Sequence, residues 1–154
     1  MLRWRRFRNL LDAENGTASL EFVTAGMILL LPMVYLVLTM SALQAGSLAV
    51  DGAARQAVRV YVQAADTREA EAEAERAIRF ALADYGLDSS DASVVISCAP
   101  RAADCLRRRA TVTITVGISV GLPLVPPGLS IDGPLTVPLR SIATEQVSRF
   151  WGAP

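Results

Sequence analysis

The stretch GTASLEFVTAGMILLLPMVYLVLTMSALQAGSLAV, residues 16–50, decides how this chain is organised. From Phe22 to Val50 it contains no charged residue, and this run exceeds the roughly 20 apolar residues that cross a bilayer core of about 30 Å as a helix. We therefore predict a transmembrane helix that continues beyond the membrane, over residues 17–62. Four arginines lie within the first eight residues, so the positive-inside rule predicts a cytoplasmic N-terminus, insertion in the plasma membrane and an extracytoplasmic remainder.

A single carboxylate, Glu21, lies at the edge of this apolar run, five residues after Gly16. An ionisable group at the start of a membrane helix is a functional candidate, because burial of its charge in lipid is unfavourable without a partner. Glu21 is therefore expected to pair with a positive group. The alternative is an ordinary acid in the first helical turn, where the macrodipole favours negative charge.

These residues resemble a known processing region. A short basic leader, Gly16, the sequence TASLEF (residues 17–22) and an apolar helix are similar to type IV pilin-like proteins, and more closely to TadE-type pseudopilins of the tight-adherence (Flp) pilus. The resemblance covers about residues 14–60. It implies that a prepilin peptidase cleaves after Gly16, that Thr17 becomes the new N-terminus, and that Glu21, followed by the aromatic Phe22, meets an N-terminal amine during assembly.

The resemblance also implies partners and a role. Other pilin or pseudopilin subunits and the pilus assembly platform would bind the processed protein. Thr17 departs from classical type IV pilins, which usually begin with an apolar or aromatic residue, and the chain is longer than a typical major Flp pilin. Both departures indicate a minor, TadE-like pilin that acts in pilus assembly or structure.

Two alternatives remain open at this stage. The chain could be an uncleaved single-span membrane protein whose outer domain binds a partner. It could also be a small secreted domain, since Ser47-Leu48-Ala49 is similar to a signal-peptidase site that would release the chain near Val50.

The remaining chain predicts one small α+β domain at residues 63–154, after a leader at 1–16 and the helix at 17–62. Asp66 and Glu69 form a capping-box pair ahead of an amphipathic helix that ends near Gly86. Alternating apolar residues predict strands over residues 93–98, 111–120 and 135–144, and the proline- and glycine-rich region 123–134 predicts a loop. We expect a three- to four-stranded antiparallel sheet, with one helix packed on its apolar face and Pro138 on an edge strand.

A stripe of small residues runs along the C-terminal part of the first helix. These residues recur at helical spacing: Ala42, Ala45, Gly46, Ala49, Ala53, Ala54 and Ala57. Such stripes allow helices to approach closely, which predicts packing against neighbouring subunits in an assembly. The alternative is alanine richness without packing specificity.

Cys98 and Cys105 are most simply read as a disulfide, because the domain is expected to face an oxidising compartment. Two free thiols or a metal pair are the alternatives, and two cysteines without histidine supply only half of a zinc site. Zero net charge argues against nucleic acid as a partner. The chain has no histidine and no recognisable nucleophile or phosphate-binding motif, so we predict no enzymatic activity, no cofactor and no metal.

Overall fold

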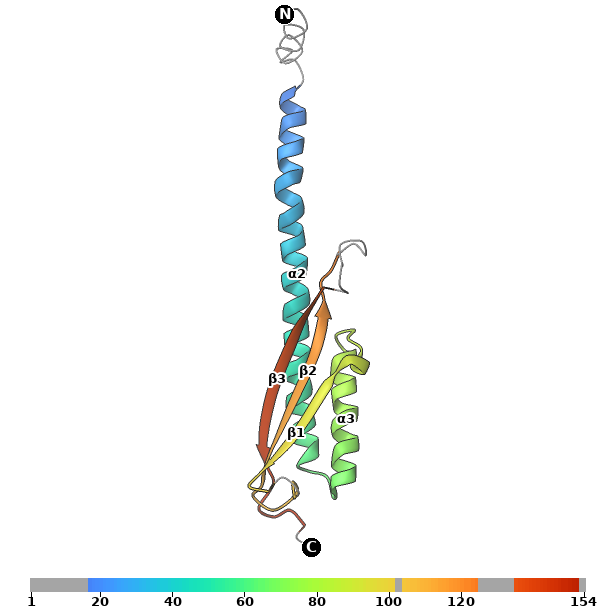
Figure 1. Ribbon diagram of the computed structural model, residues 1–154, viewed down its shortest axis with the longest axis vertical. Coiled ribbons are helices and arrows are strands. Elements are labelled where there is room, and N and C mark those ends of the chain that lie inside the picture. Colours follow the sequence, from blue (N-terminus) through green and yellow to red (C-terminus); the bar gives the residue numbers. More distant parts are fainter. Residues whose placement is uncertain (1–16, 102–103, 125–134, 153–154) are drawn as a thin grey trace, which may run out of the picture. The chain divides into compact units, whose positions relative to one another are not determined.

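The computed structural model describes residues 17–101, 104–124 and 135–152. Its elements, in chain order, are α2 (Thr17–Tyr61), α3 (Thr67–Ala83), the short 3-10 helix η1 (Ser89–Asp91), β1 (Ser93–Ala99), β2 (Thr111–Gly121) and β3 (Thr136–Gln146) (Figure 1). The chain divides into two compact units, one ending at Leu38 and the other beginning at Thr39. The predicted leader, Gly16 and most of the predicted 123–134 loop lie outside the described residues.

The second unit is an α+β domain, as predicted. Its sheet has three antiparallel strands in the order β1-β2-β3. Ile96 pairs with Ile114 across the first ladder, and Ile114 pairs with Ala143 across the second. Each strand lies within two residues of its predicted bounds, and Pro138 lies on β3, which is an edge strand. The edge position is confirmed, since proline removes a donor that a central strand requires.

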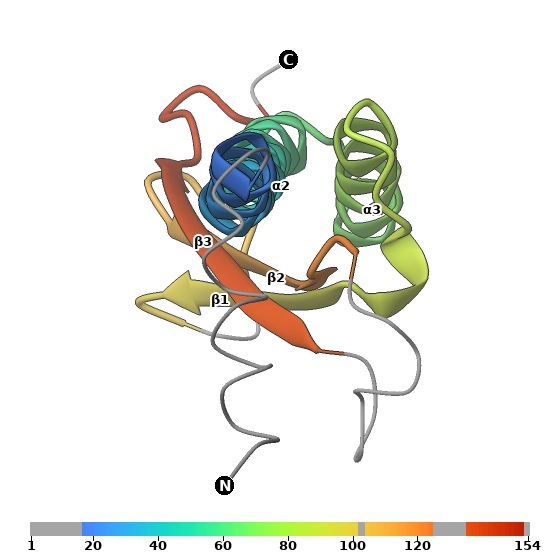
Figure 2. The ribbon, with the colours of Figure 1, turned by 90° about the horizontal axis from the view of Figure 1, so that it is seen from above.

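One face of the sheet carries the core. Along β2 every second residue is a buried aliphatic side chain: Val112, Ile114, Val116, Ile118 and Val120. The threonines that precede the first three of them, Thr111, Thr113 and Thr115, are partly buried. Two helical segments cover this face, α3 and the part of α2 after Thr39 (Figure 2). Tyr61 of α2, Leu82 of α3 and Ile114 of β2 are the largest fully buried side chains. The predicted packing of α3 on this face is confirmed, and the C-terminal part of α2 packs beside it.

The small-residue stripe explains why α2 can pack on the sheet beside α3. Ala49, Ala53 and Ala57 have no exposed surface, because they pack inside this chain's own core. At Gly46 a Cβ atom would lie 2.7 Å from Cγ2 of Val120 and 2.8 Å from Cδ1 of Leu139, so a side chain at this position would overlap two side chains of the sheet. The prediction that the stripe packs neighbouring subunits is wrong from Gly46 onward, since the same spacing is satisfied within the domain.

Both ends of α3 are capped. The Asp66 side chain accepts a hydrogen bond of 2.8 Å from the Glu69 N–H, which confirms the predicted N-cap. The Glu69 carboxylate reaches back to the N–H of Ala65, one residue before the position that a standard capping box would use. At the other end the Leu87 N–H bonds to the Leu82 carbonyl, and Gly86 has a φ of +68°, which is the Schellman pattern.

The two edge strands differ in composition. β3 contains Pro138, Arg140 and Glu145, which discourage the addition of a further strand. β1, with the sequence SVVISCA, contains no proline and no charged residue. Five of its seven residues are exposed, including Val94 and Val95.

Candidate functional site

The N-terminal part of α2 is apolar around its whole circumference. Every side chain from Ser19 to Leu38 is exposed. The large apolar side chains among them are Leu20, Phe22, Val23, Met27, Ile28, Leu29, Leu30, Leu31, Met33, Val34, Tyr35, Leu36, Val37 and Leu38. A helix that is hydrophobic on all sides is either buried in a protein or surrounded by lipid, and the side chains of this segment are exposed among the described residues.

The length of this segment matches a bilayer. Residues 17–38 of α2 extend over about 33 Å at about 1.5 Å per residue, close to the hydrocarbon thickness of about 30 Å. Among the described residues, α2 is the one helix long and apolar enough to cross a membrane. The helix is continuous through Pro32. Proline inside a helix is tolerated in membrane spans better than in soluble helices, because neighbouring groups satisfy the freed carbonyl.

Polar groups within this segment are few. The Thr24 hydroxyl donates a hydrogen bond of 2.7 Å to the Leu20 carbonyl, so it is satisfied by its own helix. Glu21 is the one charged residue between Thr17 and Val50. Its side chain is exposed, and no basic group among the described residues forms an ion pair with it. A carboxylate in this setting is unfavourable until a positive group from elsewhere reaches it.

The structure places most of the predicted processing and assembly residues on one helix. Thr17 is the first residue of α2, and Glu21 lies just over one turn later. The first turn of the described helix holds no acidic residue, which weakens the reading of Glu21 as a simple macrodipole partner. Phe22, the adjacent aromatic, is 79% exposed. Gly16 lies outside the described residues.

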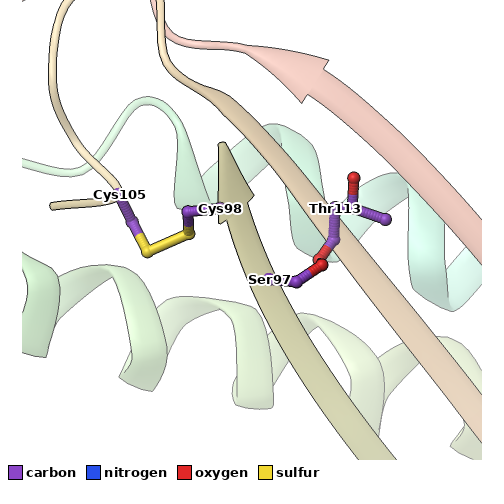
Figure 3. Close-up of a disulfide and its surroundings, with 4 residues drawn as sticks. All are labelled: Ser97, Cys98, Cys105 and Thr113. Atoms are coloured by element: carbon purple, nitrogen blue, oxygen red, sulfur yellow. A yellow bond between two sulfur atoms is a disulfide. The ribbon is translucent and has the colours of Figure 1, made fainter. Parts of the chain in front are cut away.

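The predicted disulfide is present. Cys98 near the end of β1 is bonded to Cys105 in the following loop, with their Cα atoms 5.2 Å apart (Figure 3). The bridge closes the loop that leads from β1 to β2. Beside it, the Ser97 hydroxyl donates a hydrogen bond of 3.4 Å to the Thr113 carbonyl of β2. The two cysteines therefore serve the architecture of this end of the domain, and a thiol or metal function is not needed to explain them.

A set of contacts that the sequence did not predict closes the same end. The Trp151 indole donates a hydrogen bond of 2.9 Å to the Ala64 carbonyl, in the turn between α2 and α3. The Arg108 side chain donates a bond of 2.8 Å to the Trp151 carbonyl. Val147 and Arg109–Ala110 exchange backbone hydrogen bonds beyond the end of the β2–β3 ladder. The C-terminal segment is thus fixed to the loop after β1 and to the helical turn.

The described residues of the domain line several grooves. One groove lies between α2 and β3 and is lined by Arg55, Arg59 and Glu145. Next to it along the chain, Asp51 of α2 pairs with Arg55 at 3.0 Å and accepts a hydrogen bond of 3.1 Å from Ser141 of β3. These contacts tie the helix to the edge strand. Within the described ranges, no group of three or more His, Cys, Asp or Glu side chains is placed to hold a metal ion.

No family model, curated protein or solved structure matches this chain. The geometry of the described residues therefore carries the argument about function.

Proposed function

We propose that this chain is a minor pilin or pseudopilin of a Tad-type (Flp) pilus. It is inserted in the plasma membrane by residues 19–38, cleaved after Gly16 by a prepilin peptidase, and assembled through Glu21. The observation that carries the proposal is the fully exposed, membrane-length apolar helix with Glu21 as its one charge. The apolar surface of this helix suits lipid, and the carboxylate at its start, which forms no ion pair with a described basic group, suits a cation.

Cleavage after Gly16 would supply that cation. The new α-amine of Thr17 would lie about one helical turn from Glu21, on the same chain or on a neighbouring one. An amine and a carboxylate that are both taken from water stabilise each other, whereas either alone is costly. If the Thr17 amine of one chain pairs with the Glu21 carboxylate of another, the two chains are stabilised side by side. This is the assembly role that we assign to Glu21.

The outer domain is compatible with this setting. A disulfide persists in an oxidising compartment, which agrees with an extracytoplasmic domain beyond the membrane. The arginine-rich first eight residues favour a cytoplasmic leader, where a prepilin peptidase would meet its cleavage site.

The secreted alternative fits the packing less well. Cleavage near Val50 would cut α2 within its continuous helix, next to Ala49, which is fully buried. It would also remove Gly46 from its contact with Val120 and Leu139. A released domain would lose part of its own core, whereas cleavage after Gly16 leaves every described core residue in place.

The test is the intact mass and N-terminal sequence of the protein recovered from its native membrane. A chain that starts at Thr17 is expected. A chain that starts at Met1 would replace the proposal with an uncleaved anchored domain, and a start near Val50 would establish the secreted alternative.

A further inference from the structure

The strand β1 is an open edge of the sheet. It pairs with β2 on one side, and every second residue of such a strand directs its backbone N–H and C=O away from its neighbour. No hydrogen bond of the described residues reaches these outward groups. The opposite edge strand, β3, contains proline and charged residues, whereas β1 contains neither. The sheet therefore opposes the addition of a strand at one edge and accepts it at the other.

The hydrophobic core is incomplete along this open edge. Val94 lies opposite Val116 in the ladder, so both side chains point to the face of the sheet that carries the core. Val116 has no exposed surface, whereas Val94 is 41% exposed. The difference arises because β2 has a strand on each side and β1 has a strand on one side. A further strand beside β1 would cover the open flank of Val94.

A groove of about 400 Å³ lies beside this edge, between α3 and β1. Its apolar lining includes Ile78 of α3 and the β1 residues Val94 and Ile96. Residues 84–92 connect the end of α3 to the start of β1, so the helix and the strand run in opposite directions (Figure 1). A strand paired to β1 would direct alternate side chains into the groove, because side chains alternate between the two faces of a sheet.

Three charged side chains of α3 also line this groove, namely Glu71, Glu75 and Arg79. None of them forms an ion pair with another described residue. The two acids come earlier on α3 and therefore lie towards the C-terminal end of β1, whereas Arg79 lies towards its start. Asp91, close to the start of β1 in the chain, lines a different groove together with Arg140. The lining thus has an excess of one negative charge, and its acids are at one end.

We propose that the groove between α3 and β1 binds an extended segment of a different protein, which pairs with β1 as an antiparallel fourth strand. The side chains that enter the groove are apolar at alternate positions. A segment antiparallel to β1 begins beside the C-terminal end of β1, so a basic residue at its N-terminal side lies against Glu71 and Glu75. The backbone hydrogen bonds supply affinity, and the groove selects the side chains.

This contact joins a groove on one chain to an extended segment of another, so each copy of this protein binds one partner segment. Such a contact does not repeat between identical copies, which agrees with a minor subunit. The inference goes beyond the proposed function. It uses residues of the outer domain alone, so it holds for a chain that starts at Met1 as well as for one that starts at Thr17.

The probe is a fluorescent peptide of seven residues, the length of β1, which begins with arginine and then alternates valine with threonine. Fluorescence anisotropy measures its binding to the full-length chain in detergent micelles, with empty micelles as the blank. Two further peptides carry N-methyl groups, one on its valines and the other on its threonines. Because backbone N–H groups alternate in direction along a strand, one of these two sets faces β1. One methylated peptide should therefore lose binding, and the other should retain it.

Two adjacent valines of β1 give a matched pair of variants. Val94→Thr places a hydroxyl in the apolar groove and should weaken binding of the unmodified peptide about fivefold. Val95→Thr makes the same change on the other face of the sheet and should leave binding unchanged. Both variants keep a β-branched residue in the strand, so the fold is expected to persist.

The acidic end of the groove has its own test. Glu71→Gln with Glu75→Gln should lower the affinity for the arginine peptide about threefold, since exposed ion pairs contribute modestly. The same double variant should bind a peptide that begins with glutamine as well as the native chain does. High salt should reproduce the effect of the double variant, because exposed charges are screened.

The absence of binding at up to about 1 mM peptide would overturn the inference. Equal behaviour of the two methylated peptides, or equal effects of Val94→Thr and Val95→Thr, would overturn it as well, because binding would then not use the edge of β1. A discrete dimer of the native chain in micelles that Val94→Thr removes would assign the edge to a second copy and reject the proposed partner.

Discussion

The indole Nε1 of Trp151 donates a hydrogen bond of 2.9 Å to the backbone carbonyl of Ala64, 87 residues earlier in the chain. Ala64 is 8% exposed, so this carbonyl has little access to water if the bond is lost. We expect Trp151→Phe to lower the free energy of unfolding by about 1–2 kcal/mol, because a nearly buried acceptor is left unsatisfied. Thermal unfolding of the full chain in detergent, followed by circular dichroism, measures the change. Phe150→Ala is the control, since Phe150 is exposed and should change stability little.

Gly46 and Gly52 lie on the same helix but in different surroundings. A Cβ at Gly52 would meet no atom within 4 Å, so Gly52→Ala should raise stability by up to about 1 kcal/mol through helix propensity. A Cβ at Gly46 would overlap Val120 and Leu139, so Gly46→Ala should instead cost about 1–3 kcal/mol. The same unfolding measurement compares the two variants. Equal stability of the two would contradict the close approach of α2 to the sheet.

The bridge between Cys98 and Cys105 closes a short loop, with a sequence separation of 7. We expect Cys98→Ser with Cys105→Ser to lower the free energy of unfolding by about 2–3 kcal/mol, since a closed loop restricts the unfolded chain. Melting curves with and without reductant give the comparison. Reductant should lower the melting temperature of the native sequence and leave the double variant unchanged.

Glu21→Ala is expected to leave membrane insertion intact, because it makes the apolar segment more apolar. It should abolish co-assembly with partner pilins, since the carboxylate that receives the amine is gone. Fractionation of membranes and of sheared pili measures both effects. Glu71→Ala removes an exposed acid on α3 and should assemble normally. Incorporation of the Glu21→Ala chain at the native level would end the assignment of an assembly role to this residue.

Gly16→Ala should slow cleavage of the leader and Gly16→Leu should block it, because the resemblance implies a peptidase that accepts a small residue before the cut. The change in mass between precursor and mature chain on a gel reports the extent of processing. Gly26→Ala is the matched control, since its surroundings are open and it lies away from the cleavage position. Full processing of the Gly16→Leu variant would contradict the proposed cleavage by a prepilin peptidase.

Much of the outer domain could be predicted from its periodicity. The alternation in residues 111–120 and the capping pair Asp66 and Glu69 are local signals, and both elements formed as expected. The role of the small-residue stripe could not be predicted in the same way. A helix face of alanine and glycine fits a neighbouring helix or the chain's own sheet equally well, and only the tertiary packing decides between them.

The hydrogen bonds of the C-terminal segment are harder to predict from the sequence. Trp151 and Arg108 act as single residues 43 positions apart, and no repeating pattern links them. A tryptophan near the end of a chain does indicate that its N–H will need an acceptor, but sequence alone does not name Ala64 as that acceptor. At the candidate site, the apolar span and Glu21 were identified from the sequence. That the span is exposed on every side became apparent only from the three-dimensional structure.

The uncharged edge of β1 has a consequence for the isolated protein in solution. An exposed strand without charge or proline offers its free backbone groups to any other extended chain, which is the first step of edge-to-edge aggregation. Concentrated or refolding samples should therefore lose material to β-rich precipitate, and the loss should grow with concentration. A single lysine at the exposed Val95 should slow that precipitation, because a charge at the edge makes the addition of further strands unfavourable.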